Sequence, residues 1–255
     1  MTVKLFAETY GSGLPLTLIH GYPLDHTIWN SLIPKIEGEA RLILPDLRGH
    51  GQSPIPEGPY SMREMAEDVV SLWDELRIDK SVIGGHSMGG YVSLAVARYF
   101  PERLAGLVLV ASRVNADAPE KRKARLASIE DVRKNGAASA VSSMPEKLSY
   151  NNAVRDQCKE IIAKASTSGV MGVLAAMANR PDSMELFINL ELPAMIIAGR
   201  EDQIVPIEST RAVAQKMRKP WLVEISDAGH MPMLEKPNEV AVALSEFIQN
   251  IKENC

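Results

Sequence analysis

The chain contains little cysteine, no long apolar run and no large excess of one charge. Its two cysteines are Cys158 and Cys255. A disulfide framework is therefore not expected, and a reducing, cytoplasmic location is. A prenyl anchor needs cysteine fourth from the end, so the terminal Cys255 does not predict one. The opening stretch MTVKLFAETY carries charges and lacks an apolar signal region, so we expect a first strand there. No run reaches the length of a membrane span.

The charge balance excludes partners that require a basic surface. The chain has 28 basic and 32 acidic residues, for a net charge of −4. Such a balance provides no field for nucleic acid or an anionic membrane. We expect a small-molecule partner instead, and a homo-oligomer is compatible with the sequence.

Length and composition indicate one globular domain with an insertion. At 255 residues, with 45% hydrophobic and 24% charged residues, the chain is near the upper size for a single core. Short apolar runs alternate with amphipathic stretches such as Met62–Leu76, which predicts a mostly parallel sheet covered by helices. The predicted strands are Leu16–Ile19, Leu42–Leu44, Ser81–Ile83, Leu107–Val110, Ala194–Ala198 and Trp221–Ile225.

The strand pattern stops between residues 113 and 183. Charged or alanine-rich helical stretches follow one another there, at Pro119–Lys134, Asn152–Ser166 and Gly169–Asn179. Strands return afterwards, followed by helices at Ile207–Met217 and Pro237–Ile251. We therefore expect a core formed by residues 1–112 and 184–255, with residues 113–183 as a helical cap.

A candidate nucleophile lies in the segment Gly85-His86-Ser87-Met88-Gly89. A strand precedes this G-x-S-x-G pattern and a helix follows it, which is the context of a nucleophile elbow. The glycines allow a sharp, strained turn that exposes the Ser87 hydroxyl. The pattern alone also arises by chance, so its context carries the prediction. His86 is expected to be structural or to line the pocket.

His230 is the candidate general base. It is the one histidine late in the chain, in a loop after a strand and before the final helix. Such a loop reaches over the carboxyl ends of the strands, where ligands bind in open α/β sheets. The alternative is a solvated loop histidine.

Asp202 is the candidate orienting acid. It follows the predicted strand Ala194–Ala198 and lies between Ser87 and His230 in chain order. Serine, acid and histidine follow one another in this order in proteins with a nucleophile elbow. The Asp202 carboxylate would hold the imidazole tautomer and stabilise the imidazolium. Glu201 and Asp227 are the alternatives. Asp227 is also suited to loop capping, because it lies in the same loop as His230.

Two backbone N–H groups are candidates for an oxyanion hole. Met88 follows the nucleophile at the start of a helix, and Tyr22 follows the strand at residues 16–19. Pro23 has no N–H and cannot serve. The His-Gly-Tyr-Pro segment is otherwise consistent with an ordinary turn.

These motifs together resemble the α/β-hydrolase superfamily, specifically its carboxylesterase, enol-lactonase and proline-iminopeptidase-like members. The resemblance covers Leu18–Pro23, Asp46–Ser53, Gly85–Gly89, Gly199–Pro206 and Gly229-His230. It implies an α/β-hydrolase fold, the same roles for Ser87, Asp202, His230, Tyr22 and Met88, and a structural loop at residues 46–53. Because Ser87 stands at the elbow position, relatives that use Asp there are excluded.

We therefore expect a serine carboxylesterase that cleaves small to medium acyl esters through an acyl-enzyme, without metal or organic cofactor. The candidate pocket residues are Trp29, Met171, Leu174, Met177, Ile204, Val205 and Met231. Simple helix packing explains the Met and Leu residues of the helical insertion equally well. Enol-lactonase, proline iminopeptidase, perhydrolase, hydroxynitrile lyase and ligand receptor remain alternatives. Arg113, Arg180 or Lys134 could bind a carboxylated lactone.

Overall fold

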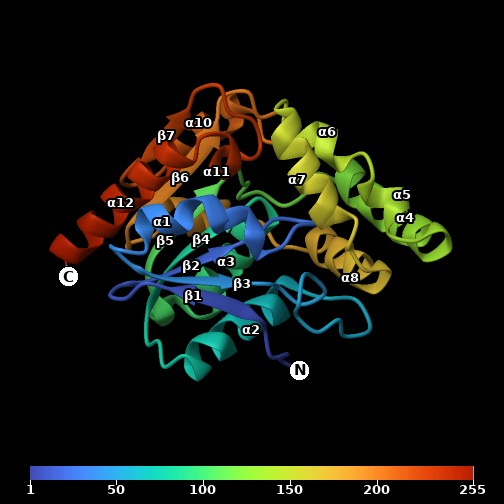
Figure 1. Ribbon diagram of the computed structural model, residues 1–255, viewed down its shortest axis with the longest axis horizontal. Helices are drawn as coiled ribbons and strands as arrows, with labels where there is room; N and C mark the ends of the chain where they lie inside the picture. Colours follow the sequence, from blue (N-terminus) through green and yellow to red (C-terminus); the bar gives the residue numbers. More distant parts are fainter. Residues whose placement is uncertain (255) are drawn as a thin grey trace.

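A seven-stranded sheet forms the centre of the protein (Figure 1), in a computed structural model that describes residues 1–254. The strands are β1 (Ala7–Tyr10), β2 (Pro15–Ile19), β3 (Arg41–Pro45), β4 (Ser81–His86), β5 (Leu104–Val110), β6 (Ala194–Gly199) and β7 (Leu222–Ile225). Their spatial order is β1-β3-β2-β4-β5-β6-β7. Only β1 pairs antiparallel, with β3, and the other pairs are parallel. The predicted mostly parallel α/β architecture is confirmed.

The central strands are buried because their sequences are apolar or glycine-rich throughout. Every residue of β4 is buried, and six of the seven residues of β5 are buried as well. Such runs suit strands that are covered on both faces. The strands predicted from the sequence lie within the observed ones, with two exceptions: the first strand, expected within residues 1–10, begins only at Ala7, and Trp221 precedes β7.

Helices cover both faces of the sheet (Figure 1). Outside residues 113–183 they are η1 (His26–Leu32), α1 (Ile33–Ile36), α2 (Met62–Glu75), α3 (Met88–Tyr99), η2 (Pro101–Arg103), α9 (Met184–Ile188), α10 (Ile207–Ala214), α11 (Pro232–Glu235) and α12 (Pro237–Asn254). Helix α2 packs against α3, while α1, α12 and η1 pack together. Ser61 and Glu64 form a capping box that begins α2.

Residues 113–183, which we call the helical segment, contain no strand among the described residues. Their helices are α4 (Pro119–Asn135), α5 (Ala138–Val141), α6 (Met144–Leu148), α7 (Asn152–Ile162) and α8 (Thr167–Ala178). They lie together to one side of the sheet (Figure 1). The sequence pattern predicts α7 to continue to Ser166, but Ser166 is instead the N-cap of α8 and accepts a hydrogen bond from the Gly169 N–H.

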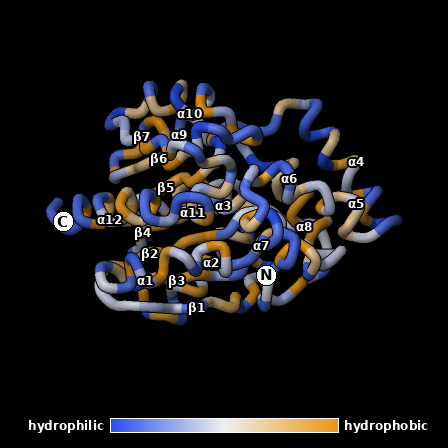
Figure 2. Tube along the Cα trace, turned by 45° about the horizontal axis from the view of Figure 1, so that its top comes forward, coloured by the Kyte–Doolittle hydropathy of each residue, from blue (hydrophilic) through white to orange (hydrophobic). Residues whose placement is uncertain are grey.

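The two long helices of this segment differ in polarity. Val132 is the one buried residue of α4, whereas most of α8 is buried and hydrophobic (Figure 2). No single helix within residues 1–254 is long and apolar enough to cross a membrane, and α7 with α8 meets the length and composition criteria only as a pair bent by 109°.

Helix α8 packs against the segment between β3 and α2. The Tyr60 N–H donates to the Gly172 carbonyl at 3.1 Å. A methyl group at Gly172 would overlap the Tyr60 ring, and one at Gly169 would overlap the Gly49 backbone. The small residues of α8 therefore permit close backbone approach and fix the helix against the loops around residues 49 and 60.

Candidate active site

Ser87 occupies a strained turn between β4 and α3. Its φ of 50° and ψ of −109° lie in a region that residues with a side chain rarely adopt. A methyl group at Gly85 would overlap the backbone of Gly89 and Gly90, and one at Gly89 would overlap the carbonyls of Ile19 and His20. Glycine at these positions therefore permits the turn, and the sequence prediction of a strained elbow agrees with the backbone.

The predicted oxyanion donors come from neighbouring strands. β2 and β4 pair in parallel, with Ile19 opposite Gly85, so the turns that follow them begin side by side. The backbone N–H groups of Tyr22 and Met88 donate no hydrogen bond to any residue in the described range. Two unpaired donors beside the Ser87 turn are available for an oxygen that carries negative charge.

His20 and the loop at residues 46–53 support the Tyr22 turn. The Leu47 N–H donates to Nε2 of the buried His20 at 2.9 Å, and His20 Nδ1 lies 2.9 Å from the Gly21 carbonyl. Because Nε2 accepts a proton donor, the hydrogen of this imidazole is on Nδ1 and points at Gly21. The ring of His50 lies edge-on to Tyr22. The loop therefore supports the turn that carries Tyr22, which agrees with the structural role that the resemblance implies for residues 46–53.

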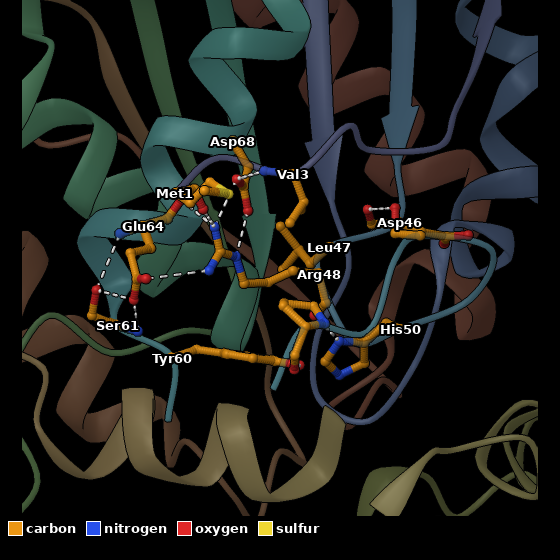
Figure 3. A network of polar contacts seen from close by, with 12 residues as sticks. Met1, Val3, Asp46, Leu47, Arg48, His50, Tyr60, Ser61, Glu64 and Asp68 are labelled. Atoms are coloured by element: carbon orange, nitrogen blue, oxygen red, sulfur yellow. Dashed lines mark hydrogen bonds and ion pairs between the residues drawn. The ribbon is translucent and has the colours of Figure 1, made fainter. Parts of the chain in front are cut away.

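A buried ion pair at Arg48, between Leu47 and His50, ties the same loop to the core (Figure 3). Arg48 Nε donates to Asp68 Oδ2 at 2.6 Å and Arg48 Nη2 donates to Asp68 Oδ1 at 2.8 Å, with neither side chain more than 3% exposed. Glu64 lies 3.5 Å from the same guanidinium. This bidentate pair ties the loop to α2, and it is held in place by hydrogen bonds on both oxygens.

Asp202 and His230 lie in direct contact. His230 Nδ1 donates to Asp202 Oδ2 at 2.7 Å, and both side chains are almost fully buried. The second oxygen of Asp202 accepts the N–H groups of Ile204 and Val205 at 2.7 and 2.9 Å. The carboxylate is therefore fixed by its own loop and can hold one tautomer of the imidazole. The two alternative acids do not bind the His230 ring: Glu201 is exposed, and Asp227 faces Lys236.

His86 connects the turn around Ser87 (residues 85–89, the nucleophile turn) to the loop between β7 and α11 that carries His230 (residues 226–231, the histidine loop). Its Nε2–H donates to the His230 carbonyl at 2.8 Å, and the centroids of the two rings are 4.9 Å apart. Burial holds the pKa of His86 well below its ordinary value, and His230 lowers it further. A neutral His86 places no cation beside His230. The structural role expected for His86 agrees with these contacts.

His230 contacts His86, the residue directly before Ser87, and its Nε2 atom has no partner in the described chain. Its N–H donates to the Leu148 carbonyl at 3.1 Å, its carbonyl accepts from His86, and its Nδ1 binds Asp202. Nε2 makes no hydrogen bond within residues 1–254, and neither does the Ser87 hydroxyl. Hydrogen bonds between a nucleophile and its base are often long before substrate binds.

Two consecutive residues after β5 join the parts of the site. The Ser112 hydroxyl donates to the Ser87 carbonyl at 2.6 Å, and the Arg113 guanidinium donates to the Ile204 carbonyl. The first contact fixes the nucleophile turn and the second fixes the loop that carries Asp202. Sequence reasoning missed both roles, although their place at the carboxyl end of a central strand was a usable signal.

The predicted pocket residues fall into two groups. Met171 and Ile204 are partly exposed, whereas the others are buried: Trp29, Leu174, Met177, Val205 and Met231. The Trp29 indole N–H and the Tyr22 hydroxyl are buried and have no hydrogen-bond partner among residues 1–254. Val205 lines a cavity of about 40 Å³ together with Leu109 and Val213. Whether these side chains contact substrate stays a prediction.

One group in the described chain has the spacing of metal ligands. Asp25, His26 and Asp46 present ligand atoms within 4.8 Å of one another. However, His26 donates both its N–H and Nδ1–H to Asp46 Oδ1 at 2.8 Å, and Asp25 accepts the Thr27 N–H at the start of η1. These hydrogen bonds give the group a structural role. Burial opposes ionisation of Asp46, but the His26 hydrogen bond lowers its pKa overall.

Comparisons with known proteins agree with this architecture. The family model described as alpha/beta hydrolase fold matches residues 15–237. A solved thermophilic esterase from Thermogutta terrifontis, with malate bound, is 37% identical, with a TM-score of 0.93 over 97% of this chain and 93% of that one. The 3-oxoadipate enol-lactonase 1 of Acinetobacter baylyi is 26% identical over 89% of this chain and 86% of its own length. The solved enol-lactonase of Burkholderia xenovorans is 22% identical, with a TM-score of 0.87 over 96% of both chains, and shows likeness of fold. The chain belongs to the α/β-hydrolase fold family.

Proposed function

We propose that the protein is a serine carboxylesterase with Ser87 as nucleophile, His230 as general base and Asp202 as the acid that orients it. The observation that carries the proposal is the buried 2.7 Å contact between His230 and Asp202. His230 also contacts His86, the residue directly before Ser87, and Ser87 has a φ of 50°. The similarity to the Thermogutta terrifontis esterase supports ester substrates.

In the proposed reaction, Ser87 Oγ attacks the ester carbonyl carbon while His230 Nε2 takes its proton. The N–H groups of Tyr22 and Met88 stabilise the oxyanion, each typically contributing ~3 kcal/mol to transition-state stabilisation. His230 then protonates the leaving alcohol, and Asp202 stabilises the intervening imidazolium. Water, deprotonated by His230, attacks the acyl-enzyme and restores the Ser87 hydroxyl.

The helical segment is proposed to cover the site as a cap. Its α8 carries Met171, Leu174 and Met177 and is fixed on the loops at residues 49 and 60. An apolar helix that is fixed in this way supports an uncharged acyl pocket of limited size.

A second candidate substrate is a lactone or ester that bears a carboxylate. Asp117 is buried and faces three cations of the helical segment, Lys121, Arg125 and Arg180. Burial raises the pKa of the Tyr22 hydroxyl, and the positive charge of Arg125 partly offsets this increase. The three cations outnumber the Asp117 carboxylate, and this excess of positive charge on the helical segment favours an anionic acyl group. Of the cations expected in this role, Arg113 and Arg180 are bound to protein groups, while Lys134 is exposed on α4.

The test is multiple turnover on p-nitrophenyl acetate, butyrate and hexanoate, compared with the p-nitrophenyl hemiester of succinate. Ser87→Ala is expected to lower kcat by at least about 10³-fold, because it removes the nucleophile. Its melting temperature should stay near that of the wild type. Activity within tenfold of the wild type would exclude Ser87 as the nucleophile, and a single burst without turnover would favour a ligand receptor over an esterase.

A further inference from the structure

The loop that carries His230 is held by two residues of the helical segment. The His230 N–H donates to the carbonyl of Leu148, the last residue of α6. The next residue, Ser149, donates its hydroxyl to the Glu235 carboxylate. Both contacts join distant parts of the chain, because Ser149 and Glu235 are 86 residues apart in the sequence.

Glu235 connects Ser149 to the histidine loop. One of its oxygens accepts the Ser149 hydroxyl, and the other accepts the N–H of Gly229, the residue before His230, at 2.7 Å. Glu235 is partly buried at the end of α11, so an unfilled hydrogen bond there is costly. The carboxylate therefore bridges the helical segment and the backbone on one side of His230.

Ser149 is suited to this contact because its hydroxyl is used twice. The oxygen accepts the Asn151 N–H at 3.0 Å at the start of α7, and the hydrogen is donated to Glu235. The Ser149 carbonyl also accepts from the Arg155 side chain. Ser149 is thus fixed by α7 and transmits the position of that helix to Glu235.

We propose that Ser149 and Glu235 are positioning residues that make the placement of His230 depend on the docking of the helical segment. This inference rests on the proposed function. When α6 and α7 are docked, His230 is held by Leu148 at its N–H and by Asp202 at Nδ1, and Gly229 is held by Glu235. When they separate from the core, Asp202 and His86 remain as partners of His230, and the loop loses its support on one side.

The test compares Ser149→Ala and Glu235→Gln with two matched controls. Ser142→Ala and Glu146→Gln make the same chemical changes at exposed positions of the same segment, where the side chains form no hydrogen bond or ion pair in the described chain. Kinetics with p-nitrophenyl butyrate should show kcat lower by about tenfold for Ser149→Ala and Glu235→Gln, the effect of one lost hydrogen bond to a charged group. KM should change by less than about twofold, because neither side chain is proposed to contact substrate.

Two further measurements distinguish positioning from a general loss of stability. The rate of inactivation by phenylmethylsulfonyl fluoride should fall together with kcat, since it reports activation of Ser87 rather than substrate fit. Ser149→Thr retains the hydroxyl and should restore both rates. If Ser149→Ala and Glu235→Gln match their controls in both rates, or if only their melting temperatures fall, the inference is wrong. Ser87→Ala remaining active would instead overturn the proposed function.

Discussion

The nucleophile turn and the histidine loop are held in place in different ways. The turn at Ser87 is fixed within the core, by glycine contacts and by hydrogen bonds to neighbouring strands, such as the 2.9 Å bond from its N–H to Val110. The histidine loop depends on the side chains of Asp202 and His86, which are distant in the sequence. It also depends on Glu235 of the following helix, which in turn binds Ser149 of the helical segment. The first arrangement is a property of the sheet, and the second requires several separate parts of the chain to meet.

The largest expected effect concerns the carboxylate that holds His230. Asp202→Asn should lower kcat by about 10⁴-fold, because the amide favours the wrong imidazole tautomer and cannot stabilise the imidazolium. Turnover of p-nitrophenyl butyrate measures the effect, and circular dichroism checks the fold. Glu201→Gln, next to it and exposed, is the control and should stay within about twofold of the wild type.

Alanine substitutions at one glycine of the nucleophile turn and one glycine of the histidine loop compare how tightly the two segments are packed. Gly85→Ala should destabilise the protein by about 2 kcal/mol or more, since its methyl group would overlap the backbone of Gly89 and Gly90. Gly229→Ala should cost less than about 1 kcal/mol, because its methyl group would lie 3.4 Å from Glu235 Oε1 and 3.6 Å from the Leu148 carbonyl. Urea denaturation measures both values. Equal destabilisation by the two variants would contradict the distinction between the sites.

A pH-dependent change in stability is expected from the buried imidazole of His50, which lies near the nucleophile turn. Burial, with a contribution from His20, lowers the pKa of His50 to about 3. Since the unfolded imidazole has a pKa of about 6.5, the unfolded chain holds more protons than the folded one between pH 6.5 and 3. The free energy of unfolding should therefore fall as pH falls below 6.5.

His50→Gln tests this assignment by removing one such group. Its free energy of unfolding should fall less steeply between pH 6 and 4 than that of the wild type, by up to about 1.4 kcal/mol per pH unit. Urea denaturation at several pH values gives both slopes. Parallel curves would show that His50 is protonated to the same extent in the folded and unfolded states.

The local features of the site were predictable from the sequence. The strands and the nucleophile turn depend on residues that are close in the chain, so apolar runs and the spacing of Gly85, Ser87 and Gly89 indicate them. Chain order and the ends of predicted strands were sufficient to select Asp202 and His230, which the structure brings together. The helix expected to reach Ser166 was wrong because a serine at this position also caps the next helix.

The supports of the histidine loop were not predictable in the same way. Leu148, Ser149 and Glu235 belong to no local pattern, and their contacts depend on how α6 and α11 pack. A serine that joins two helices and a partly buried glutamate have the same appearance in a sequence as ordinary surface residues. Arg113 was considered as a substrate ligand, but its guanidinium is bound to the Ile204 carbonyl.

The pairing of β2 with β4 has a consequence for engineering. Ile19 stands opposite Gly85, so the two turns that present the Tyr22 and Met88 amides start from strands that are hydrogen-bonded to each other. Neighbouring strands keep a spacing of about 4.8 Å whatever their side chains. Under the proposed cap role, a library that varies the helical segment would change which molecules enter, while the separation of these two amides stays constant.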